Sequence, residues 1–173
     1  ARTVVVAGAR GPGPVGPGQR CQPGDVLTDA GVWSAAGGGC VESDISAGEG
    51  GRLFGNTRRS GGRVQAGCDW IHEHGAYKGG SSSPEVTALT VYNPRVGVCR
   101  DFALLAVAFC RALNIPARYT FGYLPDIAVG VVEGAMDFHA WFEAFIGGRW
   151  YTFDARHHVP RIGRVVIGYG CDA

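Results

Sequence analysis

One segment limits the fold of this 173-residue chain more than any other: the run from Cys99 to Leu113. Apolar residues recur in it with the period of an α-helix, and the positions between them are mostly apolar too. The repeat consists of Phe102, Leu105, Ala106, Phe109, Cys110 and Leu113. Asn114 favours a helix end there, and Pro116 prevents continuation. A helix that is apolar nearly all round is buried, so other elements must cover it on several sides.

The residues around this helix are predicted to form one more helix and a set of strands. The helix is expected over residues 63–74, with Val64, Cys68, Trp70 and Ile71 on one face and Gly75 at its end. Alternating, aromatic-rich runs predict strands at 117–123, 138–146, 150–155 and 161–169. Gly147-Gly148 joins two of these runs as a hairpin. Helices followed by strands predict an α+β fold with the Cys99 helix packed on an antiparallel sheet.

The first third of the chain differs from the rest in composition. Of the 29 glycines, 16 lie in residues 1–62, where runs such as Gly11-Pro12-Gly13-Pro14 interrupt both the helical and the strand period. A short strand at 2–6 and a weak helix at 25–36 are expected, with irregular structure or disorder elsewhere. The sequence thus predicts an irregular segment over 1–62 and a core domain over 63–173.

Composition excludes several classes of function. The formal net charge is +1 and 18% of the residues are charged, which gives no sign of a nucleic acid or membrane-surface partner. No apolar run reaches the length of about 18 residues that a membrane span requires. The six cysteines are widely and irregularly spaced, unlike a disulfide framework. We therefore expect mostly reduced thiols and a cytoplasmic protein.

Cys99 is the candidate nucleophile, because a helix N-terminus stabilises the thiolate form of cysteine. Its partners follow from the register of the hairpin. A two-residue turn at Gly147-Gly148 pairs Ile146 with Arg149, so the numbers of paired residues sum to 295. Trp141 then faces Asp154, which makes Asp154 a diagonal neighbour of His139 on the same face. The sequence thus predicts a triad of Cys99, His139 and Asp154.

Each member of this triad has an expected task. Cys99 attacks an acyl carbon, His139 takes and returns the proton, and Asp154 orients the imidazole. The backbone N–H of Cys99 is a candidate oxyanion donor, with Tyr77 or Trp141 as a second. A cysteine before a helix is more often a small packed residue, and a histidine on an aromatic strand more often structural. Both interpretations stay open for each residue taken alone.

Other candidate sites and the aromatic residues lead to further expectations. His72 and His74 point to different faces of their helix, His157-His158 lie in a predicted loop, and there is no Cys-x-x-Cys pair. We therefore expect no metal and no cofactor. Phe138, Phe142, Tyr151 and Phe153 are expected in the core. Trp141, Phe145 and Trp150 share the face of His139 and are expected to wall a cleft.

Five segments of the chain resemble the transglutaminase-like superfamily of papain-type thiol enzymes, in particular its bacterial members. They are Cys68–His72, Gly97–Ala103, Asn114–Tyr119, Asp137–Glu143 and Trp150–Arg156, and the resemblance spans about residues 63–170. It implies a Cys99/His139/Asp154 triad, with the cysteine on the central helix and its partners on adjacent strands. It also implies action on amide bonds through a thioester, by hydrolysis or by transfer to an amine.

The leading hypothesis is therefore a cysteine peptidase or amidase that forms an acyl-enzyme on Cys99 and takes a peptide or protein as substrate. One alternative keeps the triad and transfers a glutamine acyl group to an amine. The other is an inactive module of the same fold that binds peptides in the same cleft.

Overall fold

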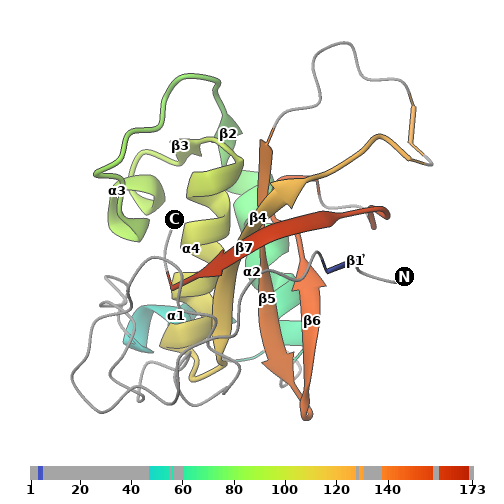
Figure 1. Cartoon of the computed structure of the whole chain (residues 1–173). Helices are drawn as coiled ribbons and strands as arrows, with labels where there is room; N and C mark the ends of the chain where they lie inside the picture. The colour runs from blue at the N-terminus through green and yellow to red at the C-terminus, as the bar shows by residue number, and fades with distance from the viewer. Residues whose placement is uncertain are drawn as a thin grey trace.

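The structure is a computed structural model that describes residues 4–5, 47–54, 56, 61–127, 129–130, 138–157 and 160–171. Its elements follow one another along the chain as shown in Figure 1. The helices are α1 (Ala47–Phe54), α2 (Gly61–His74), α3 (Ala88–Tyr92) and α4 (Cys99–Ala112). The strands are β1 (Val4–Val5), β2 (Ala76–Tyr77), β3 (Val96–Gly97), β4 (Ala117–Tyr123), β5 (Phe138–Ile146), β6 (Arg149–Phe153) and β7 (Val165–Gly170). The α+β class expected from the sequence is confirmed.

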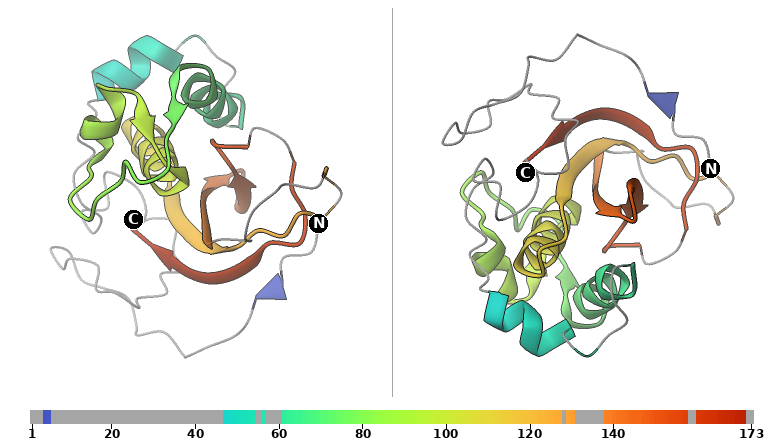
Figure 2. Two further views of the ribbon diagram at one scale, coloured as in Figure 1. Left: turned by 90° about the horizontal axis from the view of Figure 1, so that it is seen from above. Right: turned by 90° about the horizontal axis from the view of Figure 1, so that it is seen from below.

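The main sheet has the strand order β1-β7-β4-β5-β6. All its pairs are antiparallel except the short β1, which runs parallel to β7. Gly147 and Gly148 have φ of +57° and +85°, as a tight hairpin turn requires. Ile146 pairs with Arg149 and Phe142 with Phe153, so the predicted register is confirmed. Seen from above and below, β4 and β7 follow a curve, and the helices gather on one side of the sheet (Figure 2).

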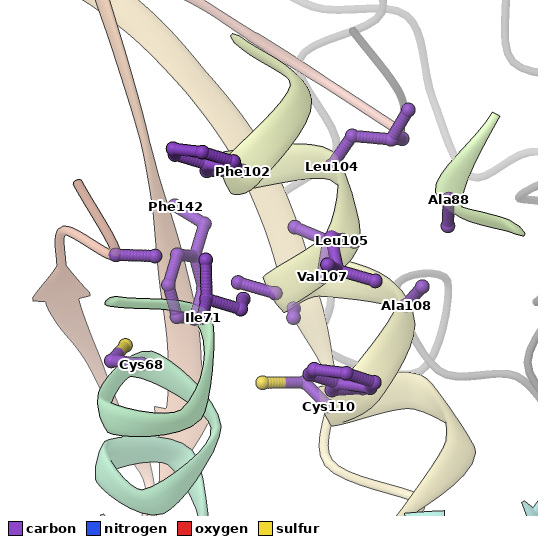
Figure 3. Close-up of a cluster of buried hydrophobic side chains, with 14 of the residues drawn as sticks. Cys68, Ile71, Ala88, Phe102, Leu104, Leu105, Val107, Ala108, Cys110 and Phe142 are labelled. Atoms are coloured by element: carbon purple, nitrogen blue, oxygen red, sulfur yellow. The ribbon is translucent and has the colours of Figure 1, made fainter. Parts of the chain in front are cut away.

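Helix α4 forms the centre of the core. Every residue from Asp101 to Ala112 is buried, which confirms the prediction of a helix covered all round. Figure 3 shows Ile71 from α2 and Phe142 from β5 beside the side chains of α4. Both residues are fully buried, at 1% and 0% exposure. Asn114 ends the helix with φ of +56°, a conformation that asparagine tolerates better than most residues.

One helix, α1, lies within the segment 1–62, for which irregular structure was expected. Phe54 is buried, and its ring meets that of Phe109 edge-on with centroids 5.1 Å apart. A Cβ atom at Gly50 would lie 3.1 Å from Cβ of Ala112, so the glycine lets α1 approach α4 closely. Tertiary packing has thus overcome low helix propensity. The expected strand near the N-terminus is present as Val4–Val5, and the expected weak helix at 25–36 lies outside the described residues.

Three short elements that the sequence did not predict connect α2 to α4. Thr87 caps α3 by accepting a hydrogen bond from Thr90 N–H, and Thr90 accepts one in return. Strands β2 and β3 pair in parallel, with Tyr77 opposite Gly97. This pairing holds the chain in place immediately before Cys99.

The cysteines fall into two groups. Cys68, Cys99 and Cys110 carry no disulfide, and Cys68 and Cys110 are buried at apolar helix positions as predicted. Cys171 is disulfide-bonded, so among the described cysteines it is the exception to the expectation of mostly reduced thiols. Cys21 and Cys40 lie outside the described residues. Among the residues that the structure describes, no helix is long and apolar enough to cross a membrane.

Candidate active site

Cys99 is the first residue of α4, and the turn that leads into it is held by a buried carboxylate. Asp101 Oδ2 accepts the backbone N–H of Val98 at 2.9 Å, and Ser82 Oγ donates to Asp101 Oδ1 at 2.6 Å. Arg100 Nη1 donates to the carbonyl oxygen of Ser83 at 3.1 Å. These bonds tie the loop before α3 to the start of α4. They hold the Cys99 thiol at the positive end of the helix.

His139 and Asp154 meet beside this thiol, as the hairpin register predicts. His139 Nε2 lies 2.8 Å from Asp154 Oδ2, and both side chains are nearly inaccessible to solvent. His139 also forms a side-chain hydrogen bond with Cys99. Because Nε2 is occupied by Asp154, the nitrogen left for Cys99 is Nδ1. The three predicted residues therefore form one hydrogen-bonded chain.

Asp154 lies immediately after the last residue of β6 and is fixed by the backbone that follows. The N–H groups of Arg156 and His157 donate to Asp154 Oδ1 at 3.0 and 3.2 Å. Arg164 Nη2 lies 3.4 Å from Oδ2. Burial opposes the charged carboxylate, but the hydrogen bond and charge of His139, together with His157, lower the pKa of Asp154 to about 2. Asp154 is thus a fixed anion at neutral pH.

The electrostatics of the other two residues favour an ion pair. Burial alone raises the pKa of the Cys99 thiol, but hydrogen bonds from His139 and the backbone N–H of Ala140, and the charges of His139 and Arg156, lower it below its ordinary value. Burial also disfavours a charged His139, yet Asp154 and Cys99 raise its pKa. A lower thiol pKa beside a higher imidazole pKa favours thiolate and imidazolium.

The other free thiols show the opposite behaviour. Burial raises the pKa of Cys110 to about 12 and that of Cys68 well above its ordinary value. Among the described cysteines without a disulfide, Cys99 alone therefore has the environment of a reactive thiol.

A pocket of about 360 Å³ opens beside this chain of residues. It is lined by Cys99, Arg100, Tyr119, Phe121, Phe138, His139 and Ala140. The sequence analysis was wrong about which aromatic residues line this pocket. Phe138, expected in the core, is 53% exposed and lines the pocket, whereas Trp141 is fully buried. Tyr151 is also exposed rather than buried in the core.

The candidate oxyanion donors receive unequal support. The backbone N–H of Cys99 lies at the helix start, where amide groups lack partners within the helix. Neither Tyr77 nor Trp141 is among the residues that line the pocket. Tyr77 instead lies under the guanidinium of Arg156, which is 3.9 Å from the ring centre. The second donor remains a prediction.

The sequence analysis missed the group formed by His139, Asp154 and His157. One potential ligand atom from each of them lies within 4.8 Å of the others, so the three could hold a metal ion. The rings of His139 and His157 have centroids 4.8 Å apart. Burial lowers the pKa of His157 to about 4, so its imidazole is neutral at pH 7. The close spacing of His157 to Asp154 was the available signal. His158 lies outside the described residues.

Comparison with known proteins identifies the family of the fold. The model of the transglutaminase-like superfamily matches residues 51–155, which is more than half of the chain. The chain belongs to this superfamily. Its match begins inside α1, within the segment that the sequence analysis had set apart from the core domain.

Known structures and one curated relative are similar over part of their length. A "Putative Cysteine Protease" from Cytophaga hutchinsonii is 36% identical with a TM-score of 0.71, covering 90% of this chain and 52% of that one. An uncharacterized protein of Mycobacterium leprae (strain TN) is 34% identical over 114 residues, 63% of this chain and 40% of the relative. The periplasmic domain of TgpA from Pseudomonas aeruginosa shares the fold at 22% identity and a TM-score of 0.51, covering 69% of this chain and 46% of that domain. The chain thus spans about half or less of each of these relatives.

Proposed function

We propose that this protein is a cysteine peptidase or amidase in which Cys99 is the nucleophile, His139 the acid and base, and Asp154 the residue that orients His139. The observation that carries the proposal is the hydrogen-bonded chain from Cys99 through His139 to Asp154, at the edge of a pocket. A cysteine that only packs in the core does not need a buried histidine–carboxylate pair beside it. An inactive protein of the same fold would not require a thiol pKa below its ordinary value.

The reaction follows from the positions of these groups. The Cys99 thiolate attacks the carbonyl carbon of an amide, and a C–S bond forms while the carbonyl oxygen becomes an oxyanion. The N–H at the start of α4 is available to that oxyanion. When the C–N bond breaks, protonated His139 gives its proton to the leaving amine. Water then attacks the thioester, His139 accepts its proton, and Cys99 is released as thiolate with a carboxylic acid product.

Hydrolysis is favoured over transfer by one comparison. The Cytophaga hutchinsonii chain, at 36% identity, is described as a protease, and its substrate class would be a peptide or protein. Transfer of a glutamine acyl group to an amine uses the same thioester and differs only in which nucleophile attacks it. An inactive peptide-binding module would retain the pocket and lose the reactivity of Cys99.

The central test compares wild type with Cys99→Ala, using a fluorogenic peptide library and a labelled peptide electrophile. We expect wild type to cleave amides and to be labelled at Cys99 alone, and Cys99→Ala to do neither. Iodoacetamide provides an internal control, because Cys110 is buried in the same molecule. Equal modification of Cys99 and Cys110 between pH 5 and 8 would contradict an activated thiol.

A second incubation separates the remaining hypotheses. With a glutamine peptide and a labelled primary amine, incorporation of the label indicates transfer, whereas release of ammonia or cleaved peptide alone indicates hydrolysis. Peptide binding that survives Cys99→Ala, with no turnover in wild type, would indicate the binding module.

The cytoplasmic location expected from the sequence stays a prediction. The disulfide at Cys171 argues against it, because disulfides persist mainly in oxidising compartments. Thiol counting on protein extracted from its native source under alkylating conditions would decide this point.

A further inference from the structure

The pocket beside Cys99 exists because α4 begins at this residue and leaves the adjoining ends of β4 and β5 uncovered. Within the helix, Ala103 packs against Tyr119 and Ala140. The aromatic residues on the same side of β4 and β5 continue past the first residue of α4, and their exposure increases along that direction. Tyr119 is 7% exposed, Phe121 is half-buried, and Tyr123 and Phe138 are 40% and 53% exposed. An apolar surface thus extends outward from the thiol.

These rings form one continuous surface. Phe121 stacks with Phe138 at 6.2 Å between centroids, Tyr119 lies 6.3 Å from Phe121, and Tyr123 meets Phe138 edge-on at 4.7 Å. Gly168 of β7 makes room for this arrangement, because a Cβ atom there would lie 2.9 Å from the ring of Phe121. Without a side chain at Gly168, the Phe121 ring can lie against the backbone of β7 and leave the pocket open.

Among the residues that line the pocket, the thiolate of Cys99 is the only anionic group. Arg100 lines it beside Cys99, and His139 is the other titratable cation. Burial raises the pKa of Tyr119, so its hydroxyl remains neutral and adds no negative charge. No acidic residue lines the pocket. The thiolate of Cys99 is paired with His139, so a positively charged substrate side chain would meet apolar rings and the uncompensated charge of Arg100.

We propose that this pocket, lined by Tyr119, Phe121, Phe138 and Arg100, binds a bulky apolar side chain, aromatic or branched aliphatic, next to the scissile bond, and that it rejects lysine and arginine. Its volume of about 360 Å³ lies at the lower end of the range for ligand sites. Cys99 and His139 are part of its wall, so a side chain bound there belongs to the peptide under attack. This inference rests on the proposed function and defines the class of substrate.

The test uses internally quenched peptides of alanine and glycine with one variable residue, which is Phe, Leu, Ala, Glu or Lys. We expect the Phe and Leu peptides to be cleaved at least about 10-fold faster than the Ala peptide, and the Lys peptide slowest. Mass spectrometry should place the cleaved bond at a fixed distance from the variable residue. Equal rates for all peptides, or cleavage unrelated to that residue, would overturn the inference while leaving the proposed function intact.

Two variants connect the preference to the pocket. Phe138→Ala should reduce the preference for the Phe peptide over the Ala peptide about 10-fold, and Phe138→Leu should restore part of that preference. Tyr151→Ala is the matched control, because Tyr151 is an equally exposed aromatic residue, at 47%, outside the pocket. A preference unchanged in Phe138→Ala, or lost equally in Tyr151→Ala, would refute the assignment.

Equilibrium binding separates this inference from failure of the chemistry. The Cys99→Ala protein should bind the Phe peptide at least about 10-fold more tightly than the Ala peptide, and the added Phe138→Ala substitution should abolish that difference. If no peptide is cleaved but this difference is found, the pocket assignment stands and the proposed hydrolysis fails. If neither is found, both fail.

Discussion

Replacing Asp154 with asparagine is the sharpest perturbation of the proposed triad, because it keeps the shape of the side chain and removes its charge. The pKa of Asp154 falls from 3.8 to about 2 in spite of burial, with His139 the strongest favourable partner. One pKa unit corresponds to about 1.4 kcal/mol, so the surroundings of Asp154 together favour its charged form by about 2 kcal/mol. Asp154 in turn raises the pKa of His139, so loss of its charge should destabilise protonated His139. The thiolate fraction of Cys99 at a given pH should then fall by roughly 10- to 100-fold.

The assay is the rate of iodoacetamide modification of Cys99 between pH 4 and 9, measured by peptide mapping. Wild type should react below the pH range of an ordinary thiol, and the midpoint in Asp154→Asn should rise by about one to two pH units. Cys110 is read in the same samples and reports whether the core has opened. Asp69→Asn is the control, because this substitution also removes a carboxylate charge, but from α2, where Asp69 accepts a hydrogen bond from Gln65. A profile of Asp154→Asn that overlays that of wild type would refute the argument that Asp154 sustains the ion pair.

Two further outcomes concern stability. Because the pKa of Asp154 is lowered in the folded state, its ionised carboxylate stabilises the fold above the unfolded value near 3.8, and this stabilisation is lost as the pH falls towards about 2. Between pH 5 and 2.5, the free energy of unfolding in urea should therefore fall by about 2 kcal/mol more in wild type than in Asp154→Asn. Equal losses in the two proteins would contradict this. Gly122→Ala places a Cβ atom in collision with the carbonyl oxygen of Val165, which is backbone and cannot move aside easily, and the substitution should cost about 3 kcal/mol or more by thermal unfolding. Gly79→Ala has open space around it and should be neutral, and equal melting temperatures for the two variants would count against the packing argument.

The parts of the fold that could be predicted are those determined by local sequence. The apolar repeat from Phe102 to Leu113 is long enough to specify both a helix and its burial. Gly147-Gly148 specifies a tight turn, and a tight turn fixes the register of both strands that it joins. The approach of His139 to Asp154 follows from that register, although the ladder itself ends at Phe153. These inferences need no knowledge of how distant segments pack.

The parts that could not be predicted depend on contacts between distant segments. Helix α1 contains glycines that lower its propensity, and it is stable because Phe54 packs on Phe109 and Gly50 fits against Ala112. The contribution of Ala140 comes from its backbone N–H, which no residue type reveals. Alternation along a strand shows which residues share a face, but not where a covering helix begins, and this is the cause of the error over Phe138. Trp141 lies on the opposite face of β5, where the guanidinium of Arg164 lies 5.6 Å from the centre of its ring.

The start of α4 therefore determines two properties of the site at once. Asp101 and Ser82, together with the pairing of β2 with β3, fix the first helical residue at Cys99. At this position the thiol lies at the helix N-terminus, where its thiolate is favoured. The same starting point leaves Phe121 and Phe138 uncovered beside it. If α4 began one turn earlier, Cys99 would lie inside the helix and away from its positive end, and the added turn would cover the apolar pocket. The proposed reactivity of Cys99 and the proposed substrate preference thus depend on the same residue, the one at which α4 begins.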